Sequence, residues 1–193
     1  MPKKFKYLYL LIVFVFTSGA VISAQEISLS VTPVKCFGDK SGSVTLNLSK
    51  GIAPYIYILS KDSLHKSEIN RSPISNDLNF LFSGVAAGRY FVTAICGDGR
   101  TSIKSLEIEQ PPQLLPGLIT VEVHPSSASS KNGILIANPQ GGNPPYTYSW
   151  QGIGVKGSES KISGLGVGIY KCSVTDSNGC GPVSSTAVLK TTS

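Results

Sequence analysis

Apolar and polar residues alternate along most of the chain, in short segments separated by turn residues. The clearest segment, residues 169–175, places Tyr170, Cys172 and Val174 on one side of an extended strand and the residues between them on the other. Residues 176–179, Asp-Ser-Asn-Gly, follow, and these residue types supply the positive φ angles of a chain reversal. The pattern predicts a half-buried strand that ends in a tight turn.

The same pattern occurs earlier in the chain. Residues 83–94 match residues 163–174 at an offset of 80, so that Tyr90 corresponds to Tyr170. Three further predicted strands recur at an offset of 91 or 92, namely residues 27–33 and 119–125, 42–48 and 133–138, and 51–57 and 142–148. One structural unit is therefore used twice.

Short alternating strands with Gly, Pro and Asn turns are typical of antiparallel β-sandwiches. We expect an all-β fold with two tandem sandwiches, over residues 25–112 and 119–193, joined by a proline-containing linker of residues 113–118. Prolines favour an extended, semi-rigid connection. The offset falls from 91 to 80 within residues 61–77, so the first unit is longer by about 11 residues. This polar segment is expected to form a lengthened loop, which either carries binding or is a solvated insertion.

Residues 1–24 have the order of a secretory signal peptide. Three lysines precede an apolar run over residues 7–16, and small residues follow up to Ala24, where cleavage is expected, with Ala20 as the alternative. The apolar run is about half of the roughly 20 residues that a spanning helix needs. We therefore expect export to the cell surface or medium and no membrane span in the mature chain.

Charge and motifs exclude several classes of function. The full chain has a net charge of +6, but without residues 1–24 it has 14 basic and 11 acidic residues, a charge of +3. No basic stripe interleaved with aromatic residues is present, so nucleic-acid binding is not expected.

The chain also lacks a nucleophile elbow, a zinc-protease motif and a phosphate-binding loop, and its histidines, His65 and His124, lie far apart in sequence. We expect no enzyme, no catalytic residues and no cofactor. Asp176 and its neighbours offer oxygen ligands for calcium, but a hairpin turn explains them without a metal.

Three blocks of the second unit resemble the SprB repeat family of gliding bacteria with type IX secretion. They are residues 141–150, 164–170 and 174–180, and the first unit keeps Cys36 and residues 108–111 of the same pattern. The resemblance implies immunoglobulin-like β-sandwiches in cell-surface adhesins and gliding-associated proteins. It implies no catalytic residues.

The four cysteines depart from the family pattern. The opening cysteine is present only in the first unit, as Cys36, and the closing cysteine only in the second, as Cys180. The resemblance implies that the opening region and the closing turn of one unit lie side by side, so we predict a Cys36–Cys96 disulfide. Cys172 is expected on the inward side of its strand with Tyr170. The four-residue turn, in contrast, places Cys180 opposite Thr175, on the outward side of that strand. Cys172 is therefore predicted to be a core residue, and Cys180 is left without a partner.

Aromatic residues mark corresponding positions in the two units. They are Tyr55 and Tyr57 in the first unit and Tyr146, Tyr148 and Trp150 in the second. These residues occupy alternate positions of a strand beside a proline, where a sandwich core needs bulky side chains, so we expect them to pack in the cores. A platform on which sugar rings stack is the alternative. Ser63 lies in an Asp-Ser-Leu sequence that resembles the O-glycosylation motif of the gliding bacteria named above.

Three functions are compatible with these observations. The first hypothesis is a non-enzymatic, secreted or cell-surface adhesive module that binds a surface protein or a polysaccharide. The second is a carbohydrate-binding accessory protein for a secreted hydrolase or a glycan-uptake system. The third is a secreted enzyme or inhibitor.

Overall fold

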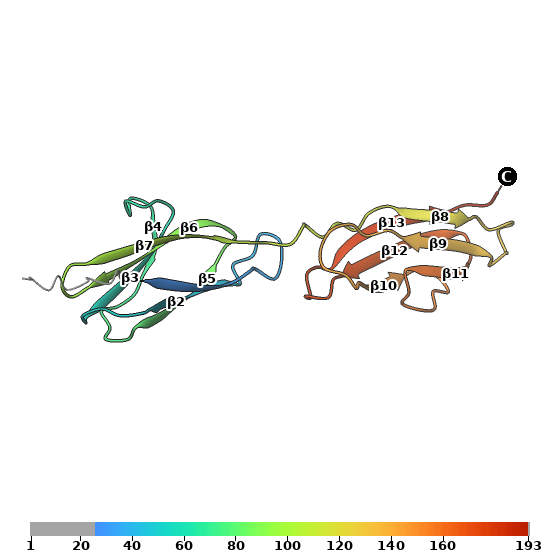
Figure 1. The fold of residues 1–193 in the computed structure, drawn as a ribbon. Coiled ribbons are helices and arrows are strands. Elements are labelled where there is room, and N and C mark those ends of the chain that lie inside the picture. The colour runs from blue at the N-terminus through green and yellow to red at the C-terminus, as the bar shows by residue number, and fades with distance from the viewer. Residues whose placement is uncertain (1–25, 193) are drawn as a thin grey trace, which may run out of the picture.

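The computed structural model describes residues 26–192, which form thirteen β-strands (Figure 1). Every strand pair is antiparallel, and the described part of the chain contains no helix. The predicted all-β fold is confirmed. No helix within these residues has the length and apolar character of a membrane span. The predicted signal peptide, residues 1–24, lies outside the described residues.

The first unit contains two antiparallel sheets. Its strands are β1 (Ile27–Thr32), β2 (Gly42–Leu48), β3 (Tyr55–Ser60), β4 (Glu68–Arg71), β5 (Asn79–Val85), β6 (Gly88–Cys96) and β7 (Thr101–Ile108). One sheet has the order β1-β2-β5, and the other has the order β4-β3-β6-β7. This strand order is that of an immunoglobulin-like sandwich.

The second unit repeats this arrangement without a counterpart of β4. Its strands are β8 (Ile119–Val123), β9 (Gly133–Ala137), β10 (Thr147–Gln151), β11 (Lys161–Leu165), β12 (Gly168–Thr175) and β13 (Val183–Leu189). The sheets have the orders β11-β9-β8 and β10-β12-β13. The internal repeat read from the sequence is therefore also a structural repeat.

Each unit has its own group of buried apolar side chains. In β2, Val44 and Leu46 point into the first core and the residues between them do not, as the alternation predicts. Leu135 and Val174 occupy the second core in the same way. Full burial of such a side chain contributes about 1.5–3 kcal/mol, so each unit has the means to fold around its own core.

A tyrosine near the start of β6 in the first unit and of β12 in the second fixes the same corner in both units. The hydroxyl of Tyr90 donates to the Ala86 carbonyl at 2.9 Å, and that of Tyr170 donates to the Gly166 carbonyl at 2.9 Å. A tyrosine corner of this kind is a hallmark of immunoglobulin-like sandwiches. The two tyrosines that the repeat aligned in sequence thus perform the same structural role.

The additional residues of the first unit form more than a loop. Residues 68–71 form strand β4, which pairs with β3 through Arg71 and Ile58. All four residues of β4 are exposed, so no alternation marked it as a strand. His65 Nε2 lies 2.6 Å from Thr93 Oγ1, which places the preceding loop over the outer face of β6. The expected lengthened loop therefore needs correction, because the free edge of β3 supplied backbone partners for a fourth strand.

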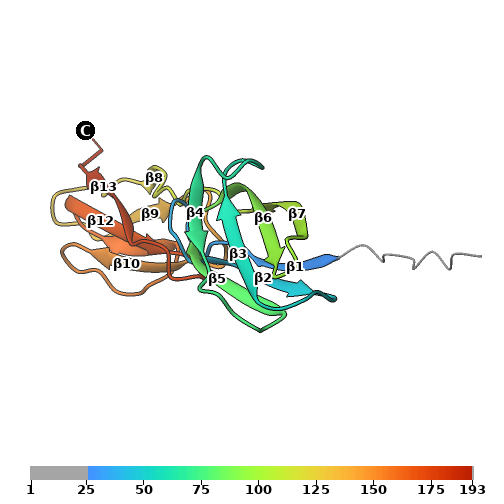
Figure 2. The same ribbon diagram turned by 90° about the vertical axis from the view of Figure 1, so that its left-hand side faces the viewer.

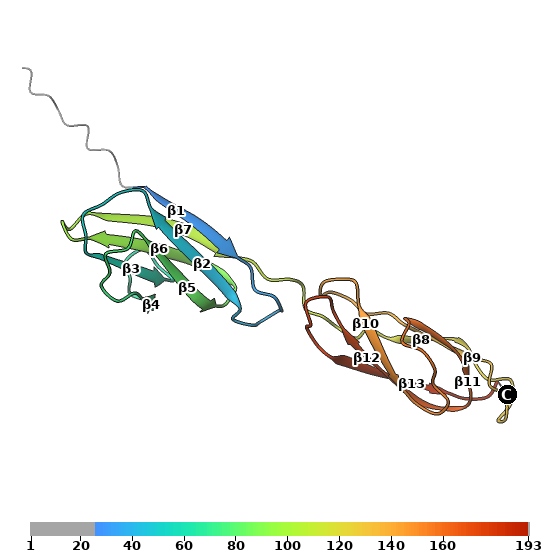
Figure 3. The ribbon, with the colours of Figure 1, turned by 90° about the horizontal axis from the view of Figure 1, so that it is seen from below.

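The units lie end to end (Figures 1 and 3), and Figure 2 views them from the side of the first unit, with the second unit behind it. The opening loop, residues 33–41, connects β1 to β2 at the end where β7 leaves for the second unit, since the Val34 N–H donates to the Glu109 carbonyl at 3.1 Å. The turn of residues 97–100 lies at the other end of the first unit. The closing turn of the second unit, residues 176–180, faces the opening loop (Figure 3).

The connection between β7 and β8 is bound to the second unit. Leu115 and Gln140 exchange two backbone hydrogen bonds of 2.8 and 3.0 Å. Leu114 is only 7% exposed. Gly141 has a φ of 67°, and a Cβ at this position would collide with the Gln113 carbonyl, so only glycine permits this close approach. The linker is therefore docked rather than free.

We expect residues 26–111 and 109–193 each to fold alone when Cys36 and Cys180 are replaced by serine, because each piece then keeps all its strands and its core. Circular dichroism and thermal melting would show a β-type spectrum and a cooperative transition for both. Residues 117–193, which lack Leu114, should be less stable than residues 109–193 by about 1–3 kcal/mol. Failure of both longer pieces to fold would indicate a core shared between the units.

Candidate functional site: the joint between the two units

The opening loop of the first unit and the closing turn of the second are covalently connected. Cys36 is bonded to Cys180, 144 positions later in the sequence, with Cα atoms 5.6 Å apart. The predicted Cys36–Cys96 disulfide is therefore wrong, and so is the expectation that Cys180 has no partner. We call the opening loop, the closing turn and this bond the joint.

Strand direction explains why Cys36 and Cys96 do not meet. Cys96 ends β6, where it pairs with Tyr55. Cys36 lies near the opposite end of β6, where Gly88 pairs with Ile108 at the end of β7. The length of β6 separates these ends by roughly 25 Å at about 3.3 Å per residue, whereas bonded cysteines need Cα atoms within about 7 Å. Cys36 therefore cannot bond to Cys96 within its own unit, and it is bonded to the closing cysteine of the next unit.

An aspartate holds each cysteine of the joint within its own loop. Asp39 accepts a hydrogen bond of 3.2 Å from the Cys36 N–H, and its carboxylate also accepts bonds from the backbone and hydroxyl of Ser41. Asp176 accepts a bond of 2.8 Å from the Cys180 N–H. The two loops thus have similar internal architecture although their sequences differ.

A hydrogen bond across the joint supplements the disulfide. The side-chain amide of Asn178 donates to the Lys35 carbonyl at 3.0 Å. Asn178 belongs to the closing turn, where its own N–H donates to Asp176 at 2.9 Å. The joint therefore combines one covalent bond with one directed polar contact, and together they oppose rotation of one unit against the other.

The environment of Asp176 stabilises its charged form. Burial of this carboxylate, which is 4% exposed, acts to raise its pKa. Backbone hydrogen bonds from Asn143, Cys180 and Asn178 outweigh burial and lower the pKa below its usual value. Because the folded-state pKa is depressed, this contribution to stability is complete above the unfolded-state value near 3.9. It is lost as the pH falls through the folded-state value.

We expect Asp176→Asn to lower the free energy of unfolding of the second unit by about 1–3 kcal/mol at pH 7, because charge-assisted bonds to three N–H groups are weakened. Urea unfolding at pH 7 and pH 3 would measure this loss, and the difference between variant and wild type should shrink at pH 3. Glu159→Gln, an exposed carboxylate of the same unit, is the control and should change stability by less than about 0.5 kcal/mol. A loss of equal size at both pH values would contradict the charge-based explanation.

The predicted glycosylation residue is accessible. Ser63 is exposed within the loop of residues 61–67. The Asp62 carboxylate accepts bonds from three backbone N–H groups of this loop, which fixes its shape. The modification of Ser63 stays a prediction.

The conspicuous aromatic residues belong to the cores. Tyr55, Tyr57 and Trp150 are buried, and burial raises the pKa of Tyr57 to about 12. Tyr146 and Tyr148 are partly buried and pack against the core of the second unit. Core packing is therefore confirmed, and these rings do not form an exposed sugar-stacking platform.

Cys172 is also a core residue, as predicted. It is fully buried on β12, and burial raises the pKa of its thiol to about 11. A thiol with this pKa stays protonated at neutral pH and is a poor nucleophile. The second core therefore holds an inert cysteine.

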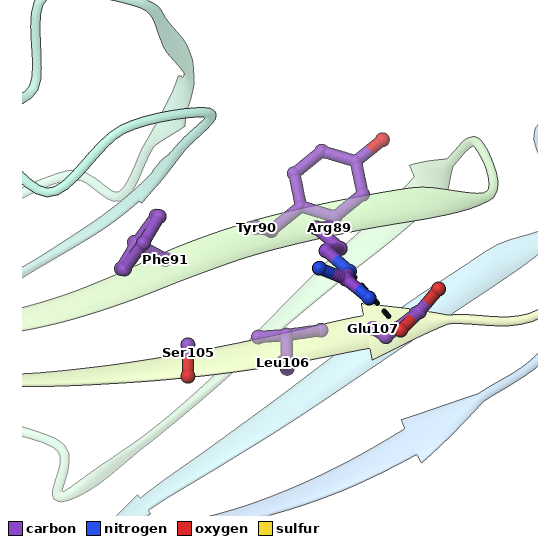
Figure 4. A pocket seen from close by; sticks show the side chains of 6 residues that line it. All are labelled: Arg89, Tyr90, Phe91, Ser105, Leu106 and Glu107. Atoms are coloured by element: carbon purple, nitrogen blue, oxygen red, sulfur yellow. Dashed lines mark hydrogen bonds and ion pairs between the residues drawn. The ribbon is translucent and has the colours of Figure 1, made fainter.

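Among residues 26–192, no group of three His, Cys, Asp or Glu side chains could hold a metal ion. A hollow of about 470 Å³ lies over β6 and β7 (Figure 4). It is lined by Arg89, Tyr90, Phe91, Ser105, Leu106 and Glu107. Its two charged side chains pair with each other, since Arg89 Nε lies 3.3 Å from Glu107 Oε2.

Residues 28–63 match the family model described as the SprB repeat. This match confirms the resemblance for the segment from β1 to the loop after β3, which includes Cys36 and the opening loop. No curated protein matches the chain in sequence.

Several solved structures are similar in fold. The C-terminal 282-residue fragment of intimin, in complex with the intimin-binding domain of its receptor, is 14% identical with a TM-score of 0.40, and the alignment covers 88% of this chain and 64% of the fragment. A two-domain fibronectin type III segment of chicken tenascin is 14% identical (TM-score 0.32; 86% and 98% covered). A tetra-tandem repeat from the extending region of a large adhesion protein is 15% identical (TM-score 0.33; 88% and 50% covered). At such values, function must be argued from the chain's own residues.

Proposed function

We propose that the chain is a non-enzymatic, adhesion-type repeat module that acts at the cell surface or in the medium, with its two units held end to end by the joint. The observation that carries this proposal is the Cys36–Cys180 disulfide. Disulfides persist in exported proteins and are rare in a reducing cytoplasm. Because this bond connects two units that have separate cores, it acts on their relative orientation.

A fixed orientation suits an adhesive module. Two units at a constant spacing can engage one extended ligand together, and the second contact then benefits from a high effective concentration. Less orientational freedom is lost on binding when the units are already held. The docked linker around Leu114 supports the same interpretation, since it reduces bending between the units.

The proposals about gliding or adhesion, export and glycosylation rest on the sequence. A gliding or adhesion role follows from the SprB repeat match over residues 28–63, and export would follow from cleavage of residues 1–24. The carbohydrate-binding accessory protein has less support, because the aromatic platform on which it drew is buried. Ser63, at an exposed position in a fixed loop, is proposed as a glycan attachment site, and the intact mass of protein from the native host would reveal the modification.

The test combines location with binding. In the native host, we expect the protein in the surface or extracellular fraction, and peptide mapping without reduction should recover the Cys36–Cys180 cross-link. Fluorescently labelled residues 25–193, prepared with the disulfide formed, should bind to cells or to a colonised surface in a saturable way. Cytoplasmic protein with both thiols reduced would contradict the proposal, as would the absence of saturable binding.

A further inference from the structure

The two units carry a groove at the same place. The first groove has a volume of about 290 Å³ and the second about 330 Å³. Lys40, Ser83, Gly84 and Ala86 line the first, and Lys131, Ser163, Gly164 and Gly166 stand at the corresponding positions of the second. We call these the first and second lysine grooves. The first groove shares Lys40 with the opening loop of the joint and Tyr90 with the first core, whereas the residues of the second groove lie outside both the joint and the second core.

A bulge in the edge strand builds each groove in the same way. Gly84 and Gly164 have φ angles of 70° and 74°, and each is skipped in the pairing of its strand with the neighbouring one. A Cβ at Gly84 would lie 3.9 Å from the Lys40 carbonyl, and one at Gly164 would lie 4.0 Å from the Lys131 carbonyl. The loop that carries the lysine therefore lies at nearly the same distance from the bulge in both units, although the sequences of the two units differ.

The cations of the grooves have no anionic partner. None of the four ion pairs among residues 26–192 includes Lys40, Lys131 or Lys156, the last of which also lines the second groove. No carboxylate lines either groove. The hollow over β6 and β7 is different, because its arginine is paired with Glu107. The lysine grooves are thus complementary to negative charge.

The linings also constrain the kind of anion. The second groove contains no aromatic ring on which a neutral sugar could stack, and in the first the Lys61 ammonium already lies 3.6 Å from the centre of the Tyr90 ring. Both grooves bear a serine hydroxyl and a glycine beside the cations, and apolar side chains complete the linings, among them Leu59, Ile69 and Val85 in the first groove and Ile153 in the second. The C–H faces of sugar rings can lie on such apolar surface while anionic groups of the same chain reach the lysines. An extended polar chain with repeated charges fits such a surface.

We propose that the lysine grooves bind an acidic polysaccharide, with its carboxylate or sulfate groups on Lys131 and Lys156 in the second unit and on Lys40 in the first. This inference rests on the proposed adhesive function and names its ligand class. A polymer that repeats one charged residue can occupy equivalent grooves in both units, and the joint sets their spacing. Simultaneous occupation strengthens binding without any new kind of contact.

The test measures binding of oxidised residues 25–193 to polygalacturonate, dextran sulfate, neutral dextran and polyglutamate. Lys131→Gln combined with Lys156→Gln should weaken binding of the acidic polysaccharide about tenfold, since each exposed charge contact contributes a few-fold. Lys171→Gln combined with Lys190→Gln removes the same charge from exposed positions outside the groove, and should weaken binding by less than about twofold. Binding should also decrease as salt increases.

The four ligands separate the possible outcomes. Binding of polygalacturonate or dextran sulfate that is weakened about tenfold only in the groove variant supports the proposal, and the polymer that binds identifies the anionic group. Equal loss in both variants, binding of neutral dextran alone, binding of polyglutamate alone, or no binding at all would overturn it. Cell binding that is as tight for the groove variant as for the wild type would also overturn the acidic polysaccharide while leaving the adhesive function intact.

Discussion

Replacing Cys36 and Cys180 by serine is expected to destabilise the protein and to release the two units from their fixed orientation. The bond closes a loop of 144 residues, for which the chain-entropy model gives a ceiling of about 5 kcal/mol. The measured loss should be smaller, about 2–4 kcal/mol, because without the bond the folded units also gain orientational freedom. Denaturant unfolding would report the stability, and small-angle X-ray scattering would report a broader range of shapes.

The two single substitutions provide an internal control. Cys36→Ser and Cys180→Ser each remove the same bond, so each should equal the double substitution instead of adding to it. Wild-type protein in the presence of a reductant should behave like the double variant. Additive single effects, or unfolding that is unaffected by reduction, would show that the disulfide does not hold the joint.

Replacing Trp150 by alanine is expected to lower the free energy of unfolding of the second unit by about 3–5 kcal/mol, because a large buried ring is removed and a cavity remains. The Trp150 side chain is 8% exposed, and its Nε1 donates to the Glu159 carbonyl at 2.9 Å. In a unit of this size each kcal/mol corresponds to about 4–8 °C in Tm. Thermal melting followed by circular dichroism would therefore show a large decrease for the second unit.

Ile169→Ala is the matched control for Trp150. Ile169 lies in the same sheet but is 70% exposed, so its truncation should cost less than about 0.5 kcal/mol. If Trp150→Ala instead left the melting temperature unchanged and abolished binding of a sugar, the ring would be part of a ligand platform. The core interpretation would then be wrong.

The fold was accessible from the sequence because its signals are local. Alternation over residues 42–48 predicted β2, since neighbouring side chains on a strand must face opposite sides. Repetition of the pattern predicted a second set of strands, and the positions of Tyr57 and Trp150 within it predicted their burial. Strand β4 was missed because residues 68–71 are all exposed, and only the free edge of β3 makes them a strand.

The partners of the cysteines and the grooves depended on the tertiary structure. The sequence placed Cys36 at an opening and Cys96 before a turn, but it did not show that the direction of β6 carries these positions to opposite ends of one sandwich. Nor did it show that the next unit brings Cys180 to the end where Cys36 lies. Lys40 and Lys131 became groove residues for a similar reason, because a bulge on a different strand lies beside each of them. Alternation is a property of neighbouring residues and can be read along the chain, whereas which loops meet depends on strand direction and on the placement of the neighbouring unit.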